Sequence, residues 1–136
     1  MKRTYPEYEL QKQCKQYLDL QYKNVLYDSD TIASIKLTAP QQGRNKAIQK
    51  EGFKRPDIVI YTPNFYYHGL FIELKVKSPF KKDGTLLKND HLEGQQNTIN
   101  DLSKLGYKAM FCTGFEEFKI AVDEYLLHVD ALNLLI

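Results

Sequence analysis

The chain has 136 residues, of which 43% are hydrophobic and 26% charged, and its formal net charge is +2. These values fit one globular domain spanning residues 1–136, and they exclude disordered and fibrous proteins. No apolar run approaches the roughly 18 residues of a membrane span, and residues 1–13 contain no apolar secretion signal. The two cysteines, Cys14 and Cys112, are too few for a disulfide framework and match no zinc-binding spacing. We therefore expect a cytoplasmic protein with reduced thiols and no role in a membrane.

Basic residues gather in two stretches of the sequence. Residues 36–55 contain six basic residues and one acid, and residues 75–88 contain five basic residues and one acid. Such runs are often no more than a solvated surface. Both stretches flank a segment with unusually placed acids, however, and this position favours a polyanionic partner.

Apolar periodicity, β-branched runs and turn residues divide the chain into helices, strands and loops. In chain order, the predicted elements are a helix from Thr4-Tyr5-Pro6-Glu7 through Leu18, a strand at Thr31–Thr38, a long basic loop at Ala39–Arg55, a short strand at Asp57–Tyr61, a turn at Thr62–Asn64, a longer strand at Tyr67–Lys77, a basic loop at Pro79–Asp90, a helix at His91–Leu105 capped by Gly106, a strand at Lys108–Thr113 and a helix at Phe115–Leu127. The order α-β-β-β-α-β-α predicts an α/β fold with a mixed central sheet flanked by helices.

Two acids occupy positions where an acid is costly. Asp57 directly precedes the apolar residues Ile58–Ile60, and Glu73 lies inside the apolar run Leu70–Val76. An unpaired carboxylate in a buried strand costs several kcal/mol or takes up a proton. Side chains alternate along a strand, so Glu73 and Lys75 share one face. Glu73 is therefore expected to meet a cation or a metal ion.

A hairpin would bring the two acids together. If the two strands pair about Phe65, Asp57 lies opposite Glu73, with their Cβ atoms about 5 Å apart. Adjacent carboxylates repel each other unless a divalent ion lies between them, and hard oxygen ligands favour Mg²⁺ or Mn²⁺ over Zn²⁺. The Glu-x-Lys triplet is not diagnostic by itself, because it recurs at Glu117. A structural ion pair between Glu73 and Lys75 is the alternative.

Glu7 is a third candidate acid, on the first predicted helix. At about 100° per residue, Glu7 shares a face with Leu10, Cys14 and Leu18, whereas Glu9 points to solvent. A glutamate three residues after a threonine also occupies the capping-box position. Glu7 can thus serve as a helix cap, as a metal ligand, or as both.

Pro56-Asp57 followed by Glu73-x-Lys75, in this order of elements, resembles the PD-(D/E)XK nuclease superfamily, above all its small stand-alone VRR-NUC domains of phages and bacteria. The resemblance covers nearly the whole chain and includes further matching motifs: Glu7-x-x-Leu10-Gln11, Gly52 before Pro56-Asp57-Ile58-Val59, Leu70-x-Ile72-Glu73-Leu74-Lys75, Gln95, and Leu102 with Gly106 and Tyr107. The family commonly has glycine shortly before Pro-Asp, where this chain has Lys54-Arg55. This departure affects the expected path of the loop into the site.

The resemblance implies a restriction-endonuclease-like fold and a Mg²⁺- or Mn²⁺-dependent deoxyribonuclease, working in the cytosol of a bacterium or a phage host. The implied metal ligands are Asp57, Glu73, the backbone carbonyl of Leu74 and, directly or through water, Glu7. Lys75 would orient or deprotonate the attacking water. Gln95 would contact that water or a neighbouring phosphate.

DNA is the implied partner, and the basic stretches are expected to hold its backbone without reading its sequence. The expected phosphate-binding residues are Arg44, Lys46, Lys50, Lys54, Arg55, Lys77, Lys81 and Lys82. The resemblance further implies branched DNA, such as a four-way (Holliday) junction, and a homodimer. The apolar tail Leu132–Ile136 can serve that dimer or pack on the last helix.

Two alternatives remain on the same fold. One is a sequence-specific restriction-type nuclease, for which 136 residues leave little room for a recognition domain. The other is a catalytically silent DNA-binding module, against which the intact Asp57, Glu73 and Lys75 argue.

Overall fold

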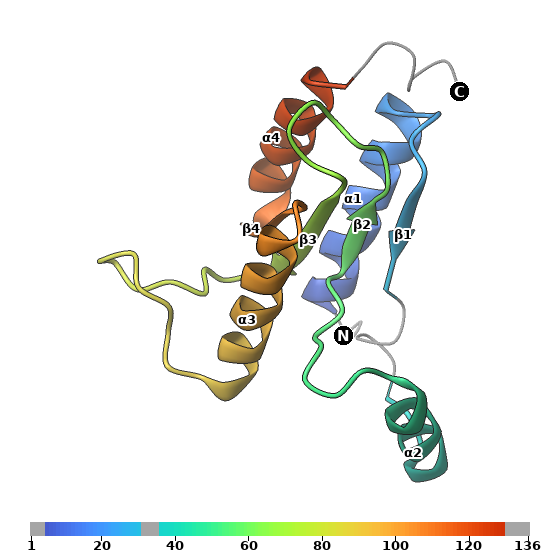
Figure 1. Cartoon of the computed structure of the whole chain (residues 1–136), viewed down its shortest axis with the longest axis vertical. Coiled ribbons are helices and arrows are strands. Elements are labelled where there is room, and N and C mark those ends of the chain that lie inside the picture. Colours follow the sequence, from blue (N-terminus) through green and yellow to red (C-terminus); the bar gives the residue numbers. More distant parts are fainter. Residues whose placement is uncertain (1–4, 31–35, 130–136) are drawn as a thin grey trace, which may run out of the picture.

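The structure is a computed structural model and describes residues 5–30 and 36–129. Its elements, in chain order, are α1 (Pro6–Gln21), β1 (Tyr27–Ser29), α2 (Ala39–Ile48), β2 (Ile58–Ile60), β3 (Leu70–Lys75), α3 (Asp90–Lys104), β4 (Lys108–Thr113) and α4 (Gly114–Leu127) (Figure 1). No helix within these two ranges is long and apolar enough to cross a membrane. The predicted α/β class, with a mixed sheet and flanking helices, is confirmed.

The four strands of the described residues lie in the order β1-β2-β3-β4. β1 pairs antiparallel with β2, and β2 pairs antiparallel with β3, whereas β3 and β4 are parallel and joined through α3. In the β2–β3 pair, Ile58 lies opposite Ile72 and Ile60 lies opposite Leu70. The hairpin is therefore centred on Phe65, as predicted from the sequence.

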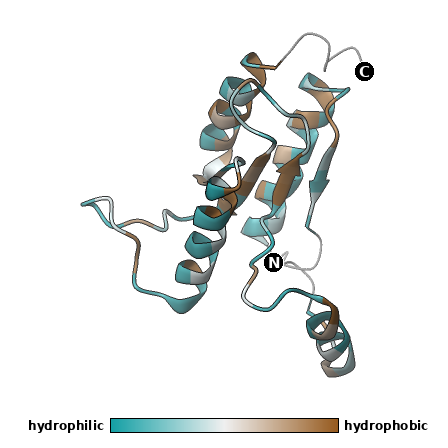
Figure 2. Cartoon of the chain, in the orientation of Figure 1, coloured by the Kyte–Doolittle hydropathy of each residue, from teal (hydrophilic) through white to brown (hydrophobic). Residues whose placement is uncertain are grey.

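The two faces of the sheet have different coverings. One face, here called the core face, carries Ile58, Ile72 and Cys112, which pack with apolar residues of α1 and α4 into one buried cluster. The opposite face, here called the site face, carries Glu73 and Lys75 and is covered by α3, which packs on β4. Figure 2 shows β2 and β3 as strongly hydrophobic segments, whereas β1 and most of α2 are hydrophilic.

Both cysteines belong to the core cluster. Cys14 on α1 and Cys112 on β4 are free thiols with no exposed surface. Burial raises the pKa of each thiol to about 12, so both stay protonated at neutral pH. The structure thus gives the cysteines a packing role, as expected.

The sequence misplaced the first strand. It predicted Thr31–Thr38, but β1 is Tyr27–Ser29, and residues 36–38 have no strand conformation. Residues 31–35 lie outside the described residues. β1 is a short edge strand whose three residues are all half-buried, so it has no alternating apolar pattern.

The loop predicted at Ala39–Arg55 contains a helix, α2. The helix begins with a capping box, in which the Gln41 N–H donates to Thr38 Oγ1 and the Thr38 N–H donates to Gln41 Oε1. Every residue of α2 is at least partly exposed. The order of elements is therefore α-β-α-β-β-α-β-α.

The ends of two other helices bear on the site. α1 begins at Pro6 after Tyr5, and no side chain caps it. Glu7 is then the second helical residue, so its predicted capping-box role is wrong; Thr4 lies outside the described residues. At the end of α3, Gly106 has φ +95° and the Tyr107 N–H donates to the Leu102 carbonyl, which confirms the predicted glycine cap.

Candidate active site

Asp57 and Glu73 meet where β2 begins and β3 ends. Continuing the β2–β3 register by one pair places Asp57 opposite Glu73, on the site face. The Leu74 backbone N–H donates to Asp57 Oδ2 over 2.7 Å, which fixes that carboxylate against β3. Glu73 is only 5% exposed. The predicted pairing of these two acids is thus present in the structure.

Because the two carboxyl groups are adjacent, ionisation of one makes ionisation of the other less favourable. Burial raises the pKa of Glu73 first, and the negative charge of Asp57 raises it further. Burial also raises the pKa of Asp57, although its hydrogen bond with Glu73 acts in the opposite direction. The pair therefore holds a proton above the usual pH for carboxylic acids. A bound cation would displace that proton, because it favours the charged form of both groups.

Lys75 lies two residues after Glu73 on the same face and is half-buried. Its positive charge lowers the pKa of both Asp57 and Glu73. The ion pairs found among the described residues are Lys15–Asp19, Arg55–Asp28 and Lys119–Asp123. The structure therefore contains no Glu73–Lys75 ion pair, which was the alternative role for both residues.

α3 brings Gln95 over the site face. Gln95 is 5% exposed, and its Oε1 atom has no hydrogen-bond partner among the described residues. One turn earlier on the same side of α3, His91 lies close enough to the acid pair to be affected by it. Burial lowers the pKa of His91, and the charges of Lys75 and Lys54 lower it further, while that of Asp57 raises it.

Gln11 on α1 ties the ends of two strands together, a role that the sequence did not reveal. Its Nε2 atom donates to Ser29 Oγ over 2.7 Å and to the Asp30 carbonyl over 2.8 Å, with a longer bond of 3.4 Å to the Asp57 carbonyl. Asp30 was also missed, although it is only 8% exposed. The sequence marks Asp30 only as an acid that directly follows a short strand. This signal is weak unless the pairing of β1 with β2 is known.

Glu7 lies one turn before Gln11 on α1 and is exposed. The predicted core-facing stripe is present, since Cys14 and Leu18 on that side are buried, but Glu7 lies at its exposed end, before the partly buried Leu10. The carboxylate can still face the open side of the site, since residues four apart share a helix face. Its role as a metal ligand stays a prediction.

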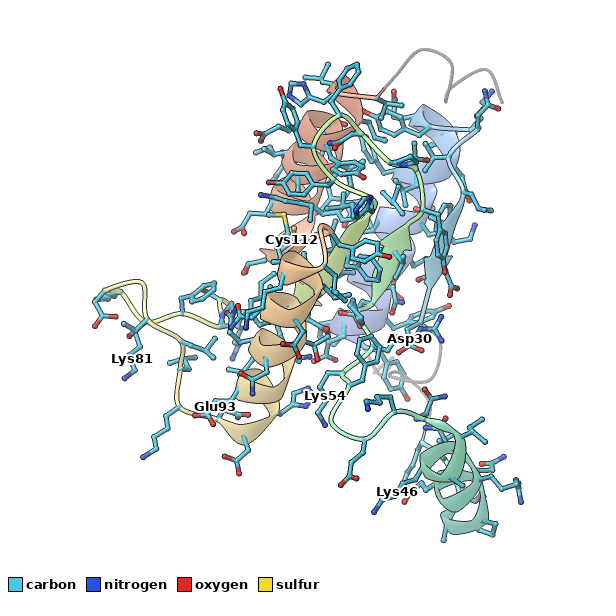
Figure 3. All side chains as sticks on the ribbon, viewed as in Figure 1. Asp30, Lys46, Lys54, Lys81, Glu93 and Cys112 are labelled. Carbon is cyan, nitrogen blue, oxygen red and sulfur yellow. The ribbon has the colours of Figure 1, made fainter. Side chains whose placement is uncertain are left out.

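The predicted phosphate-binding residues lie on two projections at this end of the sheet. We call residues 36–55, which include α2, the α2 arm, and residues 77–88 the β3–α3 loop. Figure 1 shows them projecting to opposite sides, and Figure 3 shows Lys46 and Lys81 far apart on them. Six of the predicted residues are exposed without a described ion pair: Arg44, Lys46, Lys50, Lys77, Lys81 and Lys82.

Two residues of the α2 arm have specific contacts of their own. Arg55 pairs with Asp28 on β1. The Lys54 backbone N–H donates to Thr98 Oγ1 over 3.0 Å, and its side chain packs against Gly94, both on α3. Lys54 and Arg55 replace the expected glycine before Pro-Asp, and the structure shows them docking this segment on both sides of the site.

No protein-family model and no curated protein matches the chain. Its structure is similar to that of a solved "VRR_NUC domain protein", with a TM-score of 0.63 and 20% sequence identity. The similarity covers 95% of this chain and 94% of the other. The chain has the fold of a VRR-NUC domain. The fold inferred from the sequence motifs is therefore confirmed.

The donors brought together in this VRR-NUC fold suit a hard divalent cation. They are the carboxylate oxygens of Asp57 and Glu73, and Gln95 on α3 adds an oxygen that has no partner among the described residues. Oxygen donors of this kind match Mg²⁺ and Mn²⁺. Within the described residues, no three His, Cys, Asp or Glu side chains converge closely enough to ligate one ion by themselves. A cation bound here would therefore use the two carboxylates with backbone carbonyl and water oxygens.

Proposed function

We propose that the protein is a nuclease that hydrolyses phosphodiester bonds of DNA and depends on Mg²⁺ or Mn²⁺. The observation that carries the proposal is the pairing of Asp57 with the buried Glu73, two residues before Lys75, on a VRR-NUC fold. Two adjacent carboxyl groups with raised pKa values are a costly arrangement for stability alone. Such groups are characteristic of functional sites.

In this proposal each residue of the site has a separate task. Asp57 and Glu73 hold the cation together with the backbone carbonyl of Leu74, and Glu7 reaches it directly or through water. When bound, a divalent cation polarises a phosphoryl oxygen and makes bound water more acidic. Lys75 orients the attacking water beside the scissile phosphate. The unpartnered Oε1 atom of Gln95 accepts a hydrogen bond from that water or from another water bound to the cation.

The α2 arm and the β3–α3 loop are proposed to hold the DNA backbone. Both carry an excess of exposed lysine, and they project to opposite sides of the end of the sheet that bears the acids. A strand of DNA that crosses the site would meet positive charge on either side. The contacts would be to phosphates, and binding would therefore weaken steeply with salt.

The preferred substrate is proposed to be branched DNA such as a four-way junction, cut by a homodimer. Support for this comes from the sequence resemblance to small stand-alone VRR-NUC domains. The described part of one chain contains this one candidate site, whereas a symmetric cut across a junction needs two. A second copy would supply the other.

A cleavage assay tests the function. End-labelled duplex, flap and four-way-junction DNA are incubated with the protein in Mg²⁺, Mn²⁺, Ca²⁺ or EDTA. We expect cleavage in Mg²⁺ and Mn²⁺ only, with the four-way junction cut fastest. Asp57→Asn and Glu73→Gln should each lose at least about 100-fold in rate, because each removes a charge that the cation needs.

Glu117→Gln is the matched control, since Glu117 begins the other Glu-x-Lys triplet but lies exposed on α4. Its side chain accepts from the Thr113 N–H, which glutamine can also do. Full activity is expected for this variant. Full activity of Glu73→Gln would place the chemistry elsewhere, and metal-independent DNA binding without cleavage would favour a silent binding module.

A further inference from the structure

Asp30 is a third acid at the same end of the sheet. It follows β1 and is 8% exposed. Its backbone N–H donates to the Asp57 carbonyl over 2.8 Å, which continues the β1–β2 register by one pair beyond Ser29 and Ile58. Residues directly opposite each other in antiparallel strands point to the same face. Asp30, Asp57 and Glu73 therefore form one row across three neighbouring strands.

The electrostatics agree with this placement. The negative charge of Asp30 raises the pKa of both Asp57 and Glu73, so the three carboxyl groups repel one another. Lys75 acts on the same two groups in the opposite direction.

Hydrogen bonds hold the backbone of Asp30 in this row. Gln11 Nε2 donates to the Asp30 carbonyl over 2.8 Å and to Ser29 Oγ over 2.7 Å. The backbone of Asp30 is thus held from one side by α1 and from the other by β2. In Figure 3 Asp30 lies at the same end of the sheet as Lys54, whose segment docks on α3.

An independent observation on α3 also points to a ligand at this level of the sheet. In the turn that joins α3 to β4, the Tyr107 N–H donates to the Leu102 carbonyl. Gln95 lies seven residues before Leu102 on α3, or about 10 Å along the helix axis. Phe111 lies three residues after Lys108, the first residue of β4, which is again about 10 Å from that turn. Phe111 is the residue of β4 that pairs with Glu73. Gln95 therefore lies at the level of Glu73 over the site face. Its buried oxygen has no partner among the described residues, so it needs a hydrogen-bond donor such as a water.

We propose that Asp30 belongs to the cation site and acts from its outer coordination sphere, by accepting hydrogen bonds from waters on the divalent cation. This inference rests on the proposed function, because it assumes that Asp57 and Glu73 bind the cation. An outer position fits the finding that no three acids among the described residues converge as direct ligands. Mg²⁺ keeps several of its waters in proteins, and acids that hold such waters strengthen binding.

The test is a calorimetric titration of the metal-free protein with Mn²⁺, which needs no DNA and no turnover. Asp30→Asn keeps the shape of the side chain and removes its charge, and it should weaken Mn²⁺ binding about 10-fold or more. Asp30→Ser also removes the charge without adding bulk, and it serves if the first variant does not fold. The same loss is expected for it.

Asp28→Asn is the matched control, since Asp28 lies two residues earlier on the same face of β1 and pairs with Arg55 instead. Its Mn²⁺ affinity should stay within about twofold of the wild type, because the charge removed is outside the row. Unchanged affinity in a folded Asp30 variant, while the wild type binds Mn²⁺ and cleaves DNA, would overturn the role of Asp30 alone. Absence of Mn²⁺ binding by the wild type would instead overturn the proposed function.

Discussion

Glu73 is a carboxyl group buried in a strand beside another acid, and this position gives its titration a predictable sign. Burial and the charge of Asp57 raise its pKa above the ordinary 4.5 in the folded protein. A raised pKa means that the proton favours the folded state. The stability that Glu73 contributes is complete below pH 4.5 and is lost as the pH rises through the raised pKa.

We predict that, in EDTA, the melting temperature of the wild type falls relative to that of Glu73→Gln as the pH rises above 4.5. Glutamine does not titrate, so the variant lacks the pH-dependent stability that Glu73 contributes. Thermal unfolding of both proteins across a series of pH values measures the difference. A difference that is constant with pH would show that Glu73 titrates normally.

Glu7 gives a second prediction at this scale. The start of α1 at Pro6 does not fit its capping-box role, and its role as a metal ligand is still a prediction. Glu7→Gln should lower the rate of DNA cleavage by at least about 10-fold, or about 1.4 kcal/mol of barrier, with little change in melting temperature. Glu9→Gln, two residues along the same helix, should have almost no effect. Equal activity of the two variants would remove Glu7 from the site.

The sequence predicted some of these residues and missed others for physical reasons. Asp57 and Glu73 could be paired because Asp57 precedes one apolar strand, Glu73 lies within the next, and the two strands pair about Phe65. Asp30 follows an edge strand whose residues are all half-buried, so no periodicity marks it. Gln11 acts through hydrogen bonds to backbone carbonyls of distant residues, which no local pattern encodes.

At the scale of elements, α3 and α4 were predicted closely because each buries one face at the helical period. β3 and β4 were predicted closely because each is a short, mainly apolar run bounded by turn residues. α2 was missed because none of its residues is buried and Gly43 lies in its middle. Its helix is instead marked at its start, by the Thr38–Gln41 capping box and by Pro40 in the first turn. These two signals were present in the sequence.

Gln11 joins α1 to the ends of β1 and β2, and we predict that this joint positions the acids. Gln11→Glu replaces the donating amide by an oxygen that faces the Asp30 and Asp57 carbonyls. The variant should lose about 1–3 kcal/mol of unfolding free energy. It should also bind Mn²⁺ less tightly, because both acid-bearing strand ends lose their anchor.

Chemical denaturation and calorimetry measure these two effects. Gln13→Glu is the control, since Gln13 is exposed on the same helix, and neither quantity should change. Loss of stability with unchanged Mn²⁺ affinity would limit Gln11 to a role in folding.

For the whole molecule, the α2 arm and the β3–α3 loop lie on either side of the site. If both touch phosphates, removing two lysines from either should flatten the slope of log K against log salt by about 1.8 on duplex DNA, or about 0.9 per lost contact. The variants are Lys46→Gln with Lys50→Gln, and Lys81→Gln with Lys82→Gln. Binding in Ca²⁺ at several salt concentrations gives the slopes.

Lys23→Gln with Lys108→Gln is the control pair for this measurement. Lys23 follows the end of α1, and Lys108 begins β4, so both lie at the end of the sheet away from the acids. Their removal should leave the slope unchanged. A change in the control pair and none in the other two would place the DNA on the opposite end of the molecule.

The pairing of Asp57 and Glu73 into a cation site is tested most directly by Mn²⁺ binding in two buffers of different ionisation enthalpy. The wild type should bind Mn²⁺ and release a proton, because the carboxyl pair holds one in the metal-free protein. Asp57→Asn and Glu73→Gln should bind at least about 10-fold more weakly, with less proton release from Glu73→Gln. Wild-type affinity in both variants, with no proton released by the wild type, would contradict a cation site at this pair.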